Sequence, residues 1–200
     1  MYAYLIPTVI LGLIFGSFFN VVIYRTPIAL EAKLQGKKNS SLLKQLSWPA
    51  SFCPGCTNKI SWLDNIPVFS WLLLGGKCRQ CKISIKVRYL IVELLSAIIF
   101  SYCYLKFGLS FEAVYWVVLF SLLLILFFID AETFFLPDLF TISLILLALA
   151  GSFLEITNIN FVDSLIGAIL GFLILYLINL FYKIVRKVDG FGGGDFKLLA

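Results

Sequence analysis

Five apolar stretches dominate this 200-residue sequence. They cover residues 1–24, 89–105, 113–129, 139–154 and 164–182. An α-helix needs roughly 20 residues to cross a hydrocarbon core about 30 Å thick, so these stretches are candidates for membrane spans. Only 14% of the residues are charged and 61% are hydrophobic, whereas a soluble domain averages about 25% charged residues. We therefore predict an all-α fold, a polytopic membrane helix bundle.

The first stretch, residues 1–24, is predicted to be a retained transmembrane helix. It carries no charge, so it lacks the basic region that opens a secretory signal, and no small-residue cleavage site follows it.

Most of the basic residues lie between the first two stretches. This segment, residues 25–88, holds eleven of the sixteen lysines and arginines: Arg25, Lys33, Lys37, Lys38, Lys44, Lys59, Lys77, Arg79, Lys82, Lys86 and Arg88. Cytoplasmic loops are enriched in Lys and Arg, which predicts a cytoplasmic loop here and an N-terminus outside an inner (plasma) membrane. The charge distribution accounts for the net charge of +5 without a nucleic-acid partner.

The loop 25–88 contains two pairs of cysteines, Cys53 with Cys56 and Cys78 with Cys81. Two C-x-x-C pairs at this separation are typical of a zinc ribbon with four thiolate ligands. A segment this small needs a staple to hold a fold, and a four-sulfur site leaves no open position for water. We predict structural zinc; redox-active or buried thiols are the alternative.

The fifth cysteine, Cys103, lies within the second stretch, and we interpret it as a small apolar core residue.

The sequence has no histidine, which excludes Ser-His or Cys-His nucleophiles and HExxH metal sites. Any catalysis must come from carboxylates. Asp130 ends the third stretch, where the helix macrodipole disfavours a negative charge, so a catalytic role is predicted; an interfacial polar stop is the alternative. Asp138 follows Pro137, and for this residue we favour a structural helix N-cap.

Asp195 follows a run of glycines that allows close backbone approach. A phosphate-binding loop is a weak alternative, since no strand precedes the glycines and no GK[ST] follows them. Both Asp130 and Asp195 are predicted at the cytoplasmic boundary, where the bundle could bring them together. Two carboxylates sharing a site titrate apart, so one can act as acid and the other as base, which is aspartyl protease chemistry.

Together these features resemble the type IV prepilin peptidases, whose GxGD signature is shared with other intramembrane aspartyl proteases. The resemblance rests on Phe15 to Arg25, the paired cysteines, Asp130 with Leu136-Pro137-Asp138, and Gly192 to Leu199. It implies that Asp130 and Asp195 are catalytic, that the four cysteines hold zinc, and that the substrates are prepilins or pseudopilins. Glu132 stands where many members carry another Asp.

The resemblance also implies N-methylation of the new N-terminus with S-adenosylmethionine, although no residues here identify a donor pocket. Anionic membrane lipids are expected to help a basic leader dock beside the positive loop.

By this interpretation the chain comprises a first helix (1–24), a cytoplasmic zinc loop (25–88) and a peptidase core (89–200). Members continue past the GxGD region with further helices, so we expect weak or no activity from the 200 residues alone. A non-enzymatic membrane scaffold for pilus or secretion assembly, with a zinc-stapled loop, is the rival hypothesis.

Overall fold

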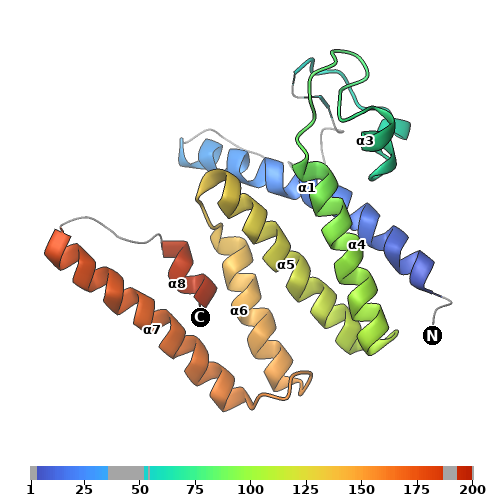
Figure 1. The fold of residues 1–200 in the computed structure, drawn as a ribbon. Helices are drawn as coiled ribbons and strands as arrows, with labels where there is room; N and C mark the ends of the chain where they lie inside the picture. Colours follow the sequence, from blue (N-terminus) through green and yellow to red (C-terminus); the bar gives the residue numbers. More distant parts are fainter. Residues whose placement is uncertain (1–3, 36–51, 54, 187–192, 200) are drawn as a thin grey trace. The chain divides into compact units, whose positions relative to one another are not determined.

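The structure is a computed structural model that describes residues 4–35, 52–53, 55–186 and 193–199. Its elements are α1 (Leu5–Leu34), the 3-10 helix η1 (Leu63–Asn65), α3 (Phe69–Leu73), α4 (Arg88–Phe107), α5 (Phe111–Thr133), α6 (Asp138–Phe153), α7 (Phe161–Arg186) and α8 (Gly193–Leu199) (Figure 1). Extended pairing in the described part of the chain is limited to two isolated β-bridges. The predicted all-α class is confirmed. Lys37, Lys38, Lys44 and Lys187 lie outside the described residues.

Four of the helices, α1, α4, α5 and α7, are long and apolar enough to cross a membrane. The fourth stretch, residues 139–154, forms α6, which has 16 residues. At 1.5 Å per residue α6 is about 24 Å long, so it falls short of the full hydrocarbon thickness.

The first helix is longer than expected. α1 has 30 residues and continues past Tyr24 as far as Leu34, through Pro27. Proline has no N–H to donate to the preceding turn, yet the helix does not stop there. Apolar residues on both sides of Pro27 explain why hydrophobicity alone does not locate the helix end.

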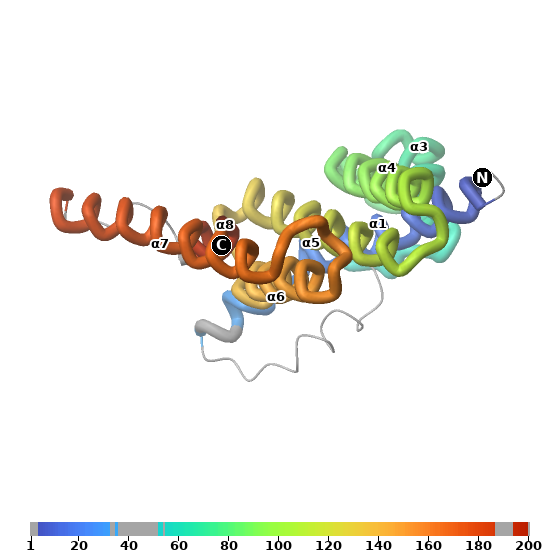
Figure 2. The backbone as a smooth tube through the Cα atoms, turned by 90° about the horizontal axis from the view of Figure 1, so that it is seen from below, coloured from blue at the N-terminus to red at the C-terminus, as the bar shows by residue number. Residues whose placement is uncertain are grey.

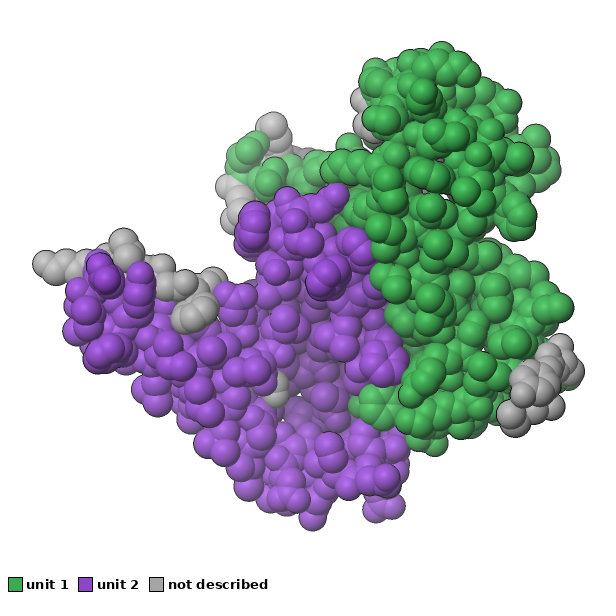
Figure 3. Space-filling model, in the orientation of Figure 1, with its two compact units in different colours: residues 1–117 green, residues 118–200 purple. Residues whose placement is uncertain are grey.

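Clustering of the chain gives two compact units, Met1–Val117 and Val118–Ala200 (Figure 3). Within the first unit, α1 packs on α4 through small residues. A Cβ added to Gly12 would lie 2.6 Å from Cα of Ala97, and one added to Gly16 would lie 2.7 Å from Cα of Glu93. Only glycine permits so close an approach of two membrane helices.

Polar groups reinforce this packing. The Asn20 side chain on α1 donates from Nδ2 to the backbone oxygen of Tyr89 on α4, at 3.0 Å. The backbone N–H of Val68, just before α3, donates to Oε2 of Glu93 on α4 at 2.7 Å. The loop is therefore fastened to the same helix that α1 packs against.

In the second unit, α8 packs against both α6 and α7. Figure 2 shows α8 beside these two helices from a second direction. This short helix carries one of the two predicted catalytic residues, so its contacts determine where that residue lies.

Candidate active site and metal centre

The two cysteine pairs form knuckles with the same backbone geometry. In each, the N–H of the first cysteine donates to the carbonyl five residues later: Cys53 to Asn58 at 3.0 Å and Cys78 to Ile83 at 2.9 Å. The residue after the second cysteine donates back to the first, from Thr57 to Cys53 at 2.9 Å and from Lys82 to Cys78 at 3.1 Å.

The two knuckles also match in their β-bridges and in the position of a residue with left-handed backbone. β-bridges close the knuckles between Phe52 and Lys59 and between Lys77 and Ser84. Thr57 and Lys82 occupy equivalent positions and both have left-handed backbone, with φ of 57° and 59°. A conformation that costs free energy for non-glycine residues, repeated at matching sites, indicates that the turn geometry is required.

Close packing brings the knuckles together. A Cβ on Gly55 of the first knuckle would lie 2.5 Å from Cδ1 of Ile83 beside the second. The sulfurs of Cys53, Cys56, Cys78 and Cys81 all lie within 4.8 Å of one another, and those of Cys53 and Cys81 are 3.7 Å apart. Sulfurs about 2.3 Å from a tetrahedral zinc would be spaced about 3.8 Å apart. The four cysteines can therefore hold a metal ion.

The thiols are electrostatically unequal. Backbone N–H groups of Cys81 and Gln80 donate to the sulfur of Cys78 and lower its pKa to about 6. The Ile83 amide acts in the same direction on Cys81, but burial and the neighbouring thiols outweigh it and raise that pKa to about 11. Amides directed at sulfur stabilise thiolate, the form that binds metal.

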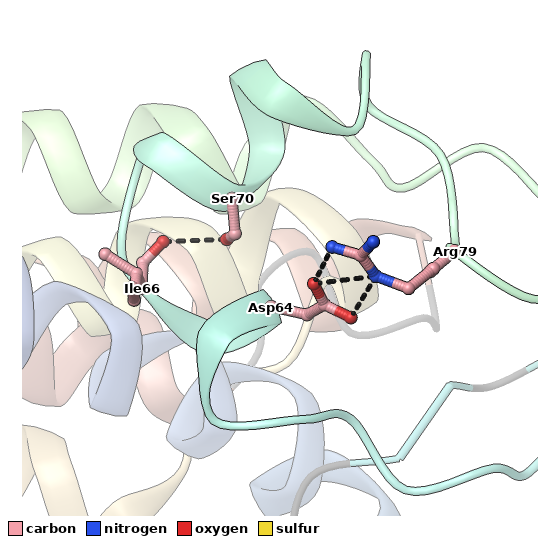
Figure 4. A network of polar contacts seen from close by, with 4 residues as sticks. All are labelled: Asp64, Ile66, Ser70 and Arg79. Atoms are coloured by element: carbon pink, nitrogen blue, oxygen red, sulfur yellow. Dashed lines mark hydrogen bonds and ion pairs between the residues drawn. The ribbon is translucent and has the colours of Figure 1, made fainter.

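An ion pair links the second knuckle to η1. The Arg79 guanidinium donates through Nε and Nη2 to the Asp64 carboxylate, with distances of 2.7–3.1 Å (Figure 4). The Arg79 hydrogen bond lowers the pKa of Asp64. In the same view, the Ser70 hydroxyl of α3 donates to the Ile66 carbonyl at 2.7 Å. The cysteine cluster and the η1–α3 segment thus form one substructure.

Cys103 is fully buried in α4. It is outside the sulfur cluster.

Asp130 and Asp195, the predicted catalytic residues, line one pocket of about 510 Å³ in the second unit. Asp130 lies near the C-terminal end of α5, and its carbonyl accepts a hydrogen bond from the N–H of Phe134 at 2.8 Å. Asp195 lies in the first turn of α8. Both side chains are half-buried, so they remain accessible to water and to a peptide.

Neighbouring residues anchor Asp195 on both sides. Phe196 is buried and meets the rings of Phe172 and Tyr176 on α7 edge-on, with centroids 6.1 and 6.3 Å apart. On the other side, a Cβ on Gly194 would lie 2.5 Å from Cβ of Leu136. The glycine before the aspartate therefore allows α8 to approach the α5–α6 connection. Gly190 and Gly192 of this motif lie outside the described residues.

Asp138 does not have the predicted role. The N-cap of α6 is Pro137, with no side-chain cap, and Asp138 is the first helical residue. Its carboxylate pairs with Nζ of Lys197 on α8 at 2.5 Å. An acidic residue in the first helical turn is favoured by the macrodipole, but the contact with α8 is the interaction that the sequence analysis missed.

The lining of this pocket is acidic on balance. Asp130, Asp138 and Asp195 face one cation, Lys197. A second pocket of about 300 Å³ shares Asp130 and is otherwise lined by Leu123, Leu126, Phe127, Leu136 and Leu198. A polar, acidic cavity and an apolar cavity therefore meet at Asp130.

Phe196 and Lys197 were not predicted as functional residues. In the sequence, only their positions beside Asp195 could have indicated a role. Their partners in the structure, Tyr176 and Asp138, are remote in sequence.

Two family models match the chain. The bacterial peptidase A24 N-terminal domain matches residues 10–107, and the type IV leader peptidase family matches residues 117–200. The first match covers the loop with the four cysteines, and the second covers both aspartates.

Curated relatives match over most of the chain, and each is named prepilin leader peptidase/N-methyltransferase. The relative from Pectobacterium carotovorum subsp. carotovorum is 39% identical, covering 96% of this chain and 71% of its own length. That from Neisseria gonorrhoeae is 37% identical, covering 96% and 70%, and that from Klebsiella pneumoniae is 38% identical, covering 94% and 79%. Comparison with solved structures finds no match.

Proposed function

Since this chain belongs to the type IV leader peptidase family, we propose that it is a membrane aspartyl endopeptidase in which Asp130 and Asp195 cut the leader from type IV prepilins or pseudopilins. The observation that carries this assignment is the shared pocket, to which α5 and α8 each contribute one carboxylate. Among residues that could serve as acid and base, these two combine half-burial with a common cavity.

Aspartyl proteolysis uses one carboxylate of a pair as a general base and the other, carrying a proton, as a hydrogen-bond donor. The ionised member takes a proton from a water, whose oxygen attacks the scissile carbonyl carbon. The protonated member donates a hydrogen bond to the developing oxyanion. Collapse of this intermediate breaks the C–N bond, and the leaving amine takes the proton that the base carboxylate had removed from the water. No metal is needed for these steps, which agrees with a four-sulfur cluster that belongs to the other unit.

The two pockets suit a substrate with a basic leader followed by an apolar segment. The acidic lining around Asp138 and Asp195 attracts the leader's cations, whereas the pocket containing Leu126 and Phe127 can accept an apolar side chain. Because both adjoin Asp130, the scissile bond would lie where the substrate changes from basic to apolar.

We propose zinc as the metal bound by Cys53, Cys56, Cys78 and Cys81. Four thiolates at tetrahedral spacing favour zinc over hard cations, and a closed site gives the metal a structural role. The site would fold the loop and supply no reactant to peptide cleavage.

The names of the relatives include N-methyltransferase, and we propose the same second activity here, with S-adenosylmethionine as the methyl donor. Transfer of a labelled methyl group from this donor to a cleaved prepilin would test it.

We also propose an inner-membrane location with the N-terminus outside and both aspartates at the cytoplasmic face. A reporter fused near residue 45 should report a cytoplasmic position, and one near residue 158 an external position. The reverse pattern would place the pocket on the wrong side for prepilins.

Asn substitutions test the carboxylate pair. Asp130→Asn and Asp195→Asn should each lower prepilin cleavage by about 10²–10⁴-fold, the usual contribution of general acid–base catalysis, because an amide cannot exchange the proton. The double variant should be little worse than either single one. Asp163→Asn is the matched control, because it removes an exposed carboxylate of the same unit that does not line the pocket, and it should retain most activity.

Cleavage should be measured on purified protein in proteoliposomes, with protease resistance of α5 to α8 confirming the fold of each variant. If Asp195→Asn still cuts prepilin at the parent rate, the aspartyl mechanism is wrong and the scaffold hypothesis gains.

A further inference from the structure

The η1–α3 segment exposes a group of large apolar side chains. Trp62, Leu63, Phe69, Leu72 and Leu73, which we call the apolar face, are between 52% and 85% exposed. Trp62 and Leu63 lie at the start of η1, and the other three lie in α3, which has no buried residue. Solvent-exposed apolar groups of this size mark a surface that binds something.

A contact with α4 fixes the depth of this segment. The Val68 N–H, between η1 and α3, bonds to Oε2 of Glu93, and Glu93 lies five residues after Arg88, where α4 begins. At 1.5 Å per residue, this contact is about 7 Å along the helix axis. α4 is about 30 Å long, the thickness of the hydrocarbon core. The segment therefore lies beside the first turns of α4, where this membrane-capable helix begins.

The backbone conformation of Val68 also indicates that its contact with Glu93 is specific. It has φ of 64° and ψ of −54°, which is strained for a β-branched residue. Glu93 satisfies the N–H of this strained turn, so the segment is held at this depth by a specific contact. Figures 1 and 2 show α3 beside the N-terminal end of α4.

The charges near the apolar face match an anionic surface. Among described residues between 52 and 87, Lys59, Lys77, Arg79, Lys82 and Lys86 are exposed cations, and Asp64 is the one carboxylate. Arg79 already neutralises Asp64. Anionic headgroups attract such clusters, and Trp and Leu beside lysines are typical of elements lying at a membrane interface.

We propose that the η1–α3 segment is an interfacial anchor, with its apolar face in the headgroup–acyl boundary of the leaflet next to the N-terminal end of α4 and its cations on anionic lipid headgroups. The Asp64–Arg79 pair then holds the sulfur cluster close to the membrane surface. This inference is independent of the peptidase assignment.

Trp62 provides a direct measurement of depth. The parent and Trp62→Phe proteins are reconstituted in phosphatidylglycerol/phosphatidylcholine vesicles, with acyl chains brominated either near the headgroup or near the chain end. The difference between the two emission spectra isolates Trp62. We expect most of this component to be quenched by the shallow bromines, less by the deep bromines, and little by aqueous iodide.

Quenching by iodide with no quenching by either brominated lipid would overturn the proposal. Iodide quenching that disappears only when a prepilin is added would assign the face to substrate and also overturn it. Equal quenching in pure phosphatidylcholine would overturn the anionic-lipid part.

A charged residue placed on the apolar face provides a second test of the interfacial position. Leu73→Glu should lift the segment, so that Trp62 loses bromine quenching and gains iodide quenching while zinc content stays at the parent value. Asn58→Glu is the matched control, because it adds the same charge to an exposed site on the first knuckle. Unchanged Trp62 quenching in Leu73→Glu would contradict an interfacial position.

Discussion

The four sulfurs of the loop come from two short segments that each determine their own turn, whereas the two aspartates of the pocket come from the ends of different helices. In the knuckles, the backbone bonds and β-bridges that shape each turn join residues within nine positions of each other. In the pocket, Asp195 depends on Phe196 meeting α7 and on Gly194 meeting Leu136.

This difference determines how each site can fail. Loss of a local turn should affect one knuckle and release the metal, while the helices of the second unit keep their packing. Loss of a tertiary contact should instead shift the Asp195 carboxylate within the pocket. The cysteine cluster should stay unchanged.

Removal of the metal ligands is the strongest test of this contrast. Cys53→Ser with Cys56→Ser should abolish metal binding and unfold the loop, because structural zinc contributes about 10–16 kcal/mol of binding free energy in small zinc domains. Zinc content measures the first effect, and protease sensitivity between residues 52 and 87 measures the second.

The same double variant should leave α5 to α8 protected from protease. Stoichiometric zinc in this variant would refute the metal assignment, and unfolding of α5 to α8 would show that the two sites are not independent.

A methyl group at Gly194 tests whether the contact between α8 and Leu136 positions Asp195. Gly194→Ala places Cβ 2.5 Å from Cβ of Leu136, so α8 must shift. A displacement of about 1 Å in an active site can cost about 10²-fold in rate, and we expect a loss of that size in prepilin cleavage with zinc retained.

Gly167→Ala on α7 is the matched control, since nothing lies within 4 Å of a Cβ at that glycine. It should cleave at the parent rate. Equal activity of the two variants would show that the approach of α8 to Leu136 does not position Asp195.

The smallest effect is expected at Asp64. Its pKa is lowered by the hydrogen bond from Arg79, so the pair stabilises the loop above the ordinary aspartate pKa of about 3.9 and loses this contribution as the pH falls through the lowered value. At pH 7 Asp64→Asn should modestly speed zinc release to a chelator.

Because the Arg79 side chain is 64% exposed, salt should screen the pair. The difference between Asp64→Asn and the parent should therefore shrink at high ionic strength. A difference that is independent of salt would assign the effect to hydrogen-bond geometry instead of charge.

Sequence patterns predicted the parts of this molecule that depend on near neighbours. The apolar stretches predicted the membrane helices, and the matched cysteine spacing predicted the cluster, because spans and knuckles are local. Helix ends were less predictable. Apolarity continues through Pro27 into the rest of α1, and α6 ends at Phe153 before reaching a full span.

The surroundings of the aspartates were only partly predictable. Asp130 and Asp195 could be chosen by elimination and by motif, but the Asp138–Lys197 pair joins residues 59 positions apart. The bond from Val68 to Glu93 likewise spans 25 positions. No local propensity encodes such distances, because they depend on which faces of the helices meet.

The glycines of α1 have a mechanical consequence for the first unit. At Gly12 and Gly16 the backbone of α1 meets α4 directly, and the rings of Phe15 on α1 and Phe100 on α4 stack with centroids 5.4 Å apart. A displacement of α1 along α4 would break both kinds of contact. The bond from Val68 to Glu93 joins the η1–α3 segment to the same pair of helices.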